Sequence, residues 1–120
     1  MMKTLLISLS VGVAAGLLGA LCGIGGGIVM VPAFTQLLGL EHKQAVATSL
    51  AIIIITALVA TTNNTKAGLV DWRIVLCAAV GAALAAWWGS DLMQSLQSTT
   101  LTRIFGITLL IFGTKMLVRP

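Results

Sequence analysis

Apolar residues fill this chain in long runs, and the few charged residues lie between those runs. No Asp, Glu, Lys, Arg or His occurs from residue 4 to residue 40, and further uncharged runs cover residues 44–65, 74–90 and 104–114. A helix needs roughly 20 apolar residues to cross a bilayer, so the first run is about two crossings long and each other run about one. The pattern predicts five apolar helical segments, at about residues 5–21, 28–40, 45–61, 74–88 and 101–118. We therefore expect an all-α, polytopic transmembrane helix bundle that occupies residues 1–120 as a single domain.

Glycine is concentrated in the first of these runs. Seven of the 13 glycines lie between Gly12 and Gly27. They include two GxxxG pairs, Gly12 with Gly16 and Gly19 with Gly23, and the fourth segment repeats the spacing with small residues at 81, 85 and 89. Small residues at this spacing let helix backbones approach closely, and in lipid such packing is a main source of attraction between helices. We therefore expect the protein to dimerise through glycine-lined helix faces.

The residues from Gly23 to Gly27 are too rich in glycine to remain a regular helix. Each glycine costs a helix about 1 kcal/mol relative to alanine, and Pro32, five residues further on, removes another backbone donor. Irregular backbone survives at membrane depth only where protein covers it or where it lines a wet cavity. The sequence therefore predicts a broken or re-entrant helix held inside the protein.

Composition and charge exclude most other classes of protein. The chain is 58% hydrophobic and 8% charged with a mean hydropathy of +1.09, too few polar residues to cover a soluble core. Its seven basic residues give a net charge of +4 but are scattered singly, which favours lipid headgroups over nucleic acid as their partner. No nucleotide-binding glycine motif, nucleophile–base pair or metal-ligand cluster is present, so we expect no enzyme, cofactor or metal. Cys22 and Cys77 are predicted to be buried as small hydrophobic residues.

The charges also bear on membrane topology. If the glycine-rich break reverses the chain, three basic residues (Lys3, Lys43, Arg103) lie on one side and four (Lys66, Arg73, Lys115, Arg119) on the other. If the first 40 residues cross only once, the count is two against five. We favour the reversal, because 37 helical residues would span about 55 Å. The near balance then predicts that both insertion orientations are populated.

A helix that restarts near Ile28 would make an anion site without any charged side chain. Its first N–H groups lack intrahelical partners and carry the positive end of the helix dipole, as at the broken helices of secondary transporters. The alternative is a tight turn that only lets two helices pack. The hydroxyls of Thr48 and Ser49 could line the same cavity, whereas residues 63–66 are interpreted as a polar loop. The candidate substrate-binding residues are thus Gly23, Gly25, Gly26, Gly27, Thr48 and Ser49.

Several short motifs, in order along the chain, resemble one family of membrane permeases. They are Gly23–Gly27 with Val31-Pro32, Ala45-Val46-Ala47-Thr48-Ser49-Leu50, Gly68-Leu69-Val70-Asp71-Trp72-Arg73, and a closing helix with Phe105-Gly106, Gly113 and Met116-Leu117. Together they resemble the sulfite exporter TauE/SafE family. The resemblance implies a multi-pass protein of the cell (inner) membrane that moves small anions, notably sulfite or organosulfonates, as a secondary transporter.

One departure from that family's pattern affects the expected assembly. Members usually carry the glycine block with its following Thr-Ser-Leu motif twice, and here it occurs once. One block would enclose half of a transport path, which favours a homodimer, parallel or antiparallel, in which two chains stand in for two repeats. The alternative function is a small, non-transporting membrane subunit that packs against a larger partner.

Overall fold

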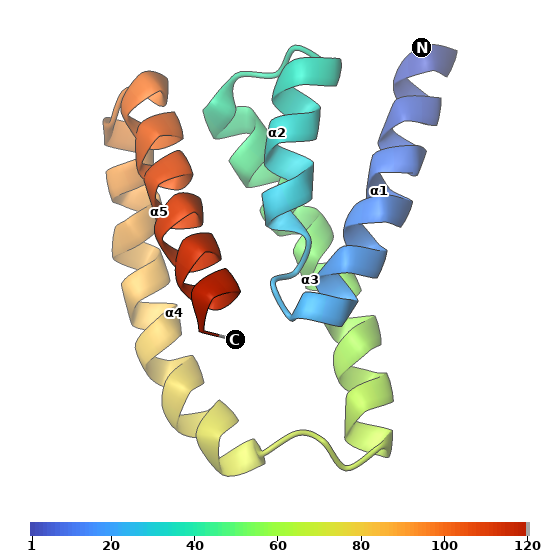
Figure 1. The fold of residues 1–120 in the computed structure, drawn as a ribbon, viewed down its shortest axis with the longest axis vertical. Coiled ribbons are helices and arrows are strands. Elements are labelled where there is room, and N and C mark those ends of the chain that lie inside the picture. Colours follow the sequence, from blue (N-terminus) through green and yellow to red (C-terminus); the bar gives the residue numbers. More distant parts are fainter. Residues whose placement is uncertain (120) are drawn as a thin grey trace.

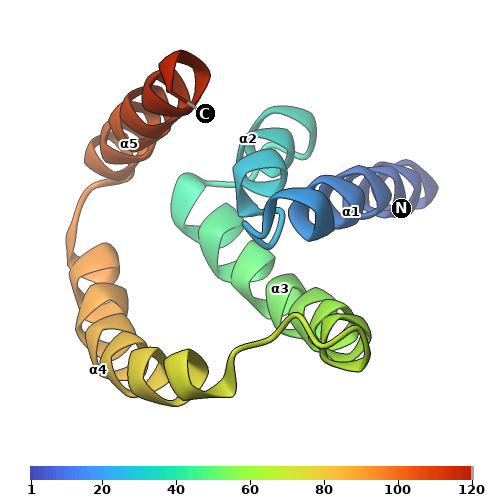
Figure 2. The same ribbon diagram turned by 60° about the horizontal axis from the view of Figure 1, so that its bottom comes forward.

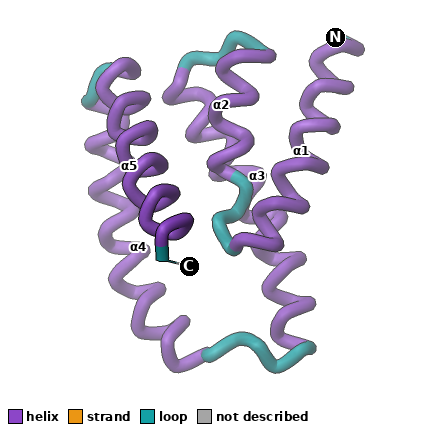
Figure 3. The backbone as a smooth tube through the Cα atoms, viewed as in Figure 1, coloured by secondary structure: helices purple, strands orange, loops and turns teal. Residues whose placement is uncertain are grey.

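The structure, a computed structural model, describes residues 1–119. It consists of five helices joined by short turns, with no strand among the described residues (Figure 3). The helices are α1 (Met2–Cys22), α2 (Gly27–Leu37), α3 (His42–Lys66), α4 (Trp72–Ser95) and α5 (Ser98–Val118). The helical fold and all five predicted segments are therefore confirmed.

The third and fourth predicted segments are both longer in the structure than expected, and α4 ends at Ser95 rather than at residue 88. The interpretation of residues 63–66 as a loop is wrong, because α3 continues through them to Lys66. The hydroxyl of Thr62 donates to the carbonyl of Leu58 at 2.8 Å, and that of Thr65 to the carbonyl of Thr61 at 2.7 Å. Such back-bonding lets polar side chains satisfy themselves within a helix, so polar character alone did not mark the end of this one.

The five helices alternate in direction along the chain (Figure 1). The turn at residues 23–26 sends α2 back alongside α1, which confirms the predicted reversal of the chain. Four helices, α1, α3, α4 and α5, are long and apolar enough to cross a membrane. With 11 residues, α2 is only about 16 Å long, roughly half of the hydrocarbon thickness. Helix α2 by itself is therefore too short to cross the membrane, whereas α3 continues past the glycine turn (Figure 1).

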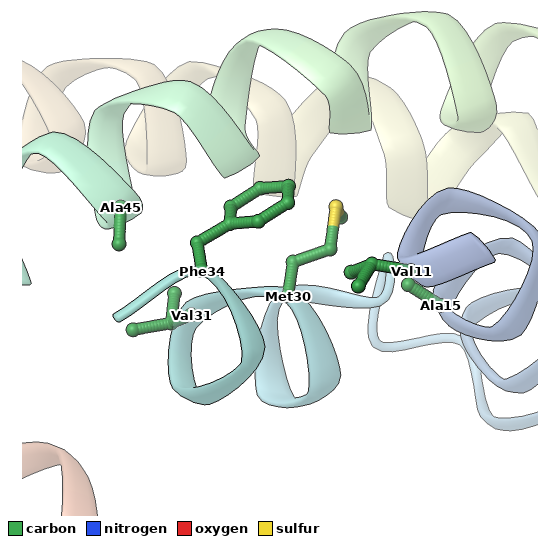
Figure 4. Close-up of a cluster of buried hydrophobic side chains, with 6 residues drawn as sticks. All are labelled: Val11, Ala15, Met30, Val31, Phe34 and Ala45. Carbon is green, nitrogen blue, oxygen red and sulfur yellow. The ribbon is translucent and has the colours of Figure 1, made fainter. Parts of the chain in front are cut away.

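The buried core lies where α2 meets α1 and α3. Met30 and Phe34 project from α2 beneath α3, and Val11 and Ala15 of α1 close the far end of the cluster (Figure 4). Val31 and Ala45 complete the six buried hydrophobic residues. Because Val11, Ala15 and Gly19 recur every four residues, they form one face of α1, and that face packs against α2. This core holds the glycine turn in place.

Helices α4 and α5 form an arm that stands away from this core (Figure 2). Neither helix has a buried residue, and α4 packs along no other helix. The arm meets α3 at one end, where the Lys43 Nζ donates to the carbonyl of Gln94 at 3.0 Å and the rings of His42 and Phe105 meet edge-on, with centroids 5.9 Å apart. We call residues 72–118 the α4–α5 arm.

Candidate functional site

The glycine turn is a true interruption of the backbone. Helix α1 ends at Gly23, which has a φ of 73° and whose N–H donates to the carbonyl of Gly19 at 2.8 Å. Helix α2 begins after Gly26, which has a φ of 83°. Residues with a side chain avoid this left-handed region, and glycine does not. The predicted break in the helix is confirmed. The positive φ angles of Gly23, Gly25 and Gly26 reverse the chain within four residues.

Two glycines bring α1 and α2 into backbone contact. A Cβ on Gly26 would lie 2.6 Å from the carbonyl oxygen of Ala15, and one on Gly19 would lie 2.6 Å from the backbone nitrogen of Gly26. No real Cβ occupies such a position, so both residues must be glycine for the helices to pack as they do. Gly19 is therefore buried within the chain, and its predicted use on a dimer face is wrong. A Cβ on Gly12 or Gly16 would meet no atom within 4 Å, so these two glycines stay available for that use.

The turn between α1 and α2 contains backbone N–H groups without a hydrogen-bond partner. The carbonyl of Gly26 accepts from Val29 at 3.1 Å and from Met30 at 2.9 Å, which starts the α2 ladder. The N–H groups of residues 24–28 donate no hydrogen bond to any other described residue. The first N–H groups of a helix carry the positive end of its dipole and attract anions. The turn thus presents backbone donors and no charged side chain.

A cleft of about 340 Å³ opens beside the turn, between the last turns of α1 and the second half of α3. The glycine turn contributes Gly23, Ile24 and Gly25 to its lining. The other lining residues are Gly16, Gly19 and Ala20 of α1, and Ile53, Thr56, Ala57, Ala60, Thr61 and Asn64 of α3. None of these residues is charged. The cleft is therefore a neutral pocket whose polar groups are backbone amides, hydroxyls and one carboxamide.

The polar side chains of the cleft differ in how far they are already paired. The Thr56 hydroxyl donates to the carbonyl of Ile53 at 3.1 Å. The hydroxyl of Thr61 and the carboxamide of Asn64 make no hydrogen bond within the described chain. Because an isolated amide or hydroxyl in an apolar setting costs free energy, these two groups are the ones that gain most from a polar occupant.

The structure separates the residues proposed from the sequence into three groups. Gly23 and Gly25 line the cleft, and Gly26 and Gly27 cap and begin α2 immediately behind it. Thr48 is exposed on α3 outside the cleft lining. Ser49 is 2% exposed, lies outside the lining as well, and donates to the carbonyl of Val46 at 2.8 Å.

Sequence reasoning passed over the α3 residues that do reach the cleft. Positions 53, 56, 57, 60, 61 and 64 recur at intervals of three and four, so they form one helix face. Thr48 precedes Ile53 by five residues, which turns it about 140° away from that face. Reading the hydroxyl and carboxamide positions of the whole segment by helical spacing would have found Thr56, Thr61 and Asn64. The prediction that Cys22 and Cys77 are buried is also wrong, because both are free and exposed on the chain.

Comparison with known proteins decides the family. The sequence profile described as "Sulfite exporter TauE/SafE" matches residues 2–120. The chain belongs to the sulfite exporter TauE/SafE family. It is accordingly a multi-pass membrane protein, in keeping with its four helices of spanning length. The resemblance drawn from the glycine block and the later motifs is confirmed.

The curated relatives are named as transporters and are longer than this chain. The probable membrane transporter protein YunE of Bacillus subtilis is 32% identical over 111 residues, which are 92% of this chain and 41% of the relative. A probable membrane transporter protein of Haemophilus influenzae is 31% identical over 98% of this chain and 47% of its own length, and one of Xylella fastidiosa is 31% identical over 88% and 40%. The chain thus spans less than half the length of the relatives it matches. No solved structure matches it.

Proposed function

We propose that this chain is a secondary transporter of small oxyanions, of the sulfite or organosulfonate type, and that the anion binds in the cleft at the glycine turn. The observation that carries the proposal is the position of the unpaired N–H groups of Ile24 and Gly25, two residues that belong to the lining of a neutral cleft. Backbone donors in an apolar setting are costly to leave unpaired. An anion, or the water that precedes it, satisfies these donors.

The chemistry of the lining suits an oxyanion in particular. An oxyanion has several acceptor oxygens, so it can share donors from the turn with the Thr61 hydroxyl and the Asn64 carboxamide. No Lys or Arg lines the cleft to hold the anion tightly, and a transport site must release its substrate as well as bind it. A volume of about 340 Å³ is ample for an ion the size of sulfite with some of its water.

Basic residues lie at the end of α3 that leads to the cleft. Lys66 ends that helix two residues after Asn64, and Arg73 follows at the start of α4. Positive charge at an entrance raises the local concentration of anions without committing a charge to the binding site. We therefore assign these two residues to attraction of substrate rather than to coordination.

We further propose that a second copy of the chain completes the path. The cleft is open on one side, and Gly23 and Ile24 of the turn are exposed. Irregular backbone needs a protein or aqueous cover within a membrane, and a homodimer, parallel or antiparallel, provides one. If the chain is instead a non-transporting subunit of a larger assembly, an unrelated partner protein would cover the open side of the cleft and the exposed turn.

Flux in reconstituted vesicles tests the proposal. Purified protein in liposomes should take up radiolabelled sulfite saturably down a gradient, above the rate of empty liposomes, and an organosulfonate should compete. Flux that never exceeds that of empty liposomes under any proton, sodium or anion gradient would reject transport and favour the non-transporting subunit.

Two threonine variants test the position of the site. Thr61→Val removes a cleft donor and keeps the shape, and because a hydrogen bond to a charged group contributes about 1.5–3 kcal/mol, the KM for sulfite should rise roughly ten- to hundredfold. Thr48→Val is the matched change outside the cleft lining and should leave KM within about twofold. The reverse result would return the site to Thr48, where the sequence placed it. Variants at Gly26 cannot decide this, because any side chain there meets Ala15.

A further inference from the structure

Four consecutive isoleucines, residues 52–55, lie on α3 and have different surroundings. Ile54 and Ile55 are 64% and 66% exposed on the chain. Ile52 and Ile53 are partly buried against the hydrophobic core, and of the four only Ile53 belongs to the lining of the cleft. The run therefore contains one side chain that faces the proposed anion site, together with identical neighbours that do not.

The Ile53 side chain lies directly against the glycine turn. A Cβ built on Gly25 would lie 3.1 Å from the Ile53 Cγ2, and one on Gly27 would lie 3.5 Å from its Cδ1. The lack of a side chain at these two positions therefore makes the room that Ile53 occupies. Since Gly25 also carries one of the unpaired N–H groups of the turn, a group bound at that donor has Ile53 as its neighbour.

Ile53 stands at the inner end of the cleft. The α3 residues that line the cleft run from Ile53 to Asn64, a distance of about 16 Å along the helix axis. Lys66, which we assign to the entrance, lies two residues beyond Asn64, so Ile53 is the α3 lining residue farthest from it. Ile53 also packs against the core cluster that contains Met30 and Phe34. Its side chain thus separates the cleft from the hydrophobic core.

We propose that Ile53 is the specificity-determining residue of the cleft, and that it limits the substrate to sulfite and to organosulfonates with a short substituent. The inference rests on the proposed function and narrows its substrate class. A sulfonate carries its three oxygens on one side of the sulfur and its carbon substituent on the other. When the oxygens face the donors of the turn, a long or aromatic substituent needs apolar space beside the turn, and Ile53 fills that space. Such exclusion is effective, because a single methylene in an apolar pocket changes selectivity by about 10- to 200-fold.

Fluxes of two anions in reconstituted vesicles test this assignment. Uptake of sulfite and of benzenesulfonate is measured as Vmax/KM in the same liposomes, and the ratio of benzenesulfonate to sulfite is compared between variants. Because both values come from one preparation, their ratio does not depend on how much of the protein is folded. Wild type should favour sulfite. Ile53→Ala, which removes three carbon atoms, should raise the ratio at least tenfold, and Ile53→Val, which removes one, should raise it by a smaller factor.

Ile54→Ala is the matched control. It removes the same three carbon atoms from a side chain that is exposed and outside the lining of the cleft, so the ratio should stay within about twofold of wild type. If the Ile53 variants also stay within that range, or if the control raises the ratio equally, the assignment is wrong, and the flux of sulfite still supports the proposed transport.

The remaining outcomes decide the matter as well. Loss of both fluxes in both Ile53 variants would overturn the assignment, because Ile53 would then serve folding alone. A wild-type chain that moves benzenesulfonate as readily as sulfite would show that Ile53 excludes nothing. If wild type moves neither anion, the proposed transport is rejected, and this inference with it.

Discussion

The close approach of α1 to α2 at Gly26 makes the sharpest prediction. Alanine at Gly26 must adopt a φ of 83°, which costs an L-residue about 1–2 kcal/mol. Its Cβ would also lie 2.6 Å from the Ala15 carbonyl oxygen, and overpacking of this kind costs about 1–3 kcal/mol. Gly26→Ala should therefore weaken the packing of α2 on α1 by about 2–5 kcal/mol.

Gly23→Ala is the matched control, because it separates the backbone strain from the steric clash. Gly23 has a φ of 73° and nothing within 4 Å of a Cβ, so the alanine should cost only the strain, about 1–2 kcal/mol. The two variants should differ by about 1–3 kcal/mol. That difference would appear as roughly five- to 150-fold faster amide exchange in α2 for Gly26→Ala than for Gly23→Ala.

Hydrogen–deuterium exchange of a peptide covering α2, followed by mass spectrometry in detergent micelles, is the suitable assay. Intrinsic fluorescence is not, because Trp72, Trp87 and Trp88 all belong to α4, which does not pack along α1 or α2. Exchange in α4 peptides should be unchanged and serves as the internal reference. Equal exchange rates in the two variants, within about twofold, would refute the backbone contact between α1 and α2.

Three further outcomes are expected. Phe34→Ala empties a core position that is 3% exposed and should lower the free energy of unfolding by about 3–5 kcal/mol. Phe112→Ala, at a position 62% exposed, should change it by less than about 1 kcal/mol. Equal losses in the two variants would contradict the assignment of Phe34 to the core. Asp71 accepts from the N–H groups of Arg73 and Ile74, so Asp71→Ala should cost about 1 kcal/mol and Asp71→Asn much less, as measured by thermal unfolding. A cysteine placed within residues 63–66 should react with impermeant thiol reagents from both faces of the membrane, and labelling from one face only would reject dual topology.

The sequence by itself determined the class of protein and the position of its interruption. Uncharged runs of spanning length and the cluster of glycines are local properties, and a bilayer acts on local hydrophobicity. They were therefore enough to predict five helices and the reversal at Gly23–Gly27, whereas the family resemblance rested on the order of several motifs from Gly23 to Leu117. The ends of the helices were predicted less well. Helix α3 continues through its polar residues to Lys66, because threonine hydroxyls there donate to backbone carbonyls one turn earlier and so remain satisfied within the helix.

Only the tertiary structure decided which small and polar residues meet. Gly19 and Gly12 belong to identical sequence patterns, yet Gly19 lies against Gly26 while Gly12 faces open space. Likewise Thr48 and Thr61 sit on the same helix, and only Thr61 reaches the cleft. The physical reason is that spacing along one helix defines its faces but not the neighbour of each face. That neighbour depends on the path of the chain through the turn, where a few positive φ angles decide which surfaces α1, α2 and α3 bring together.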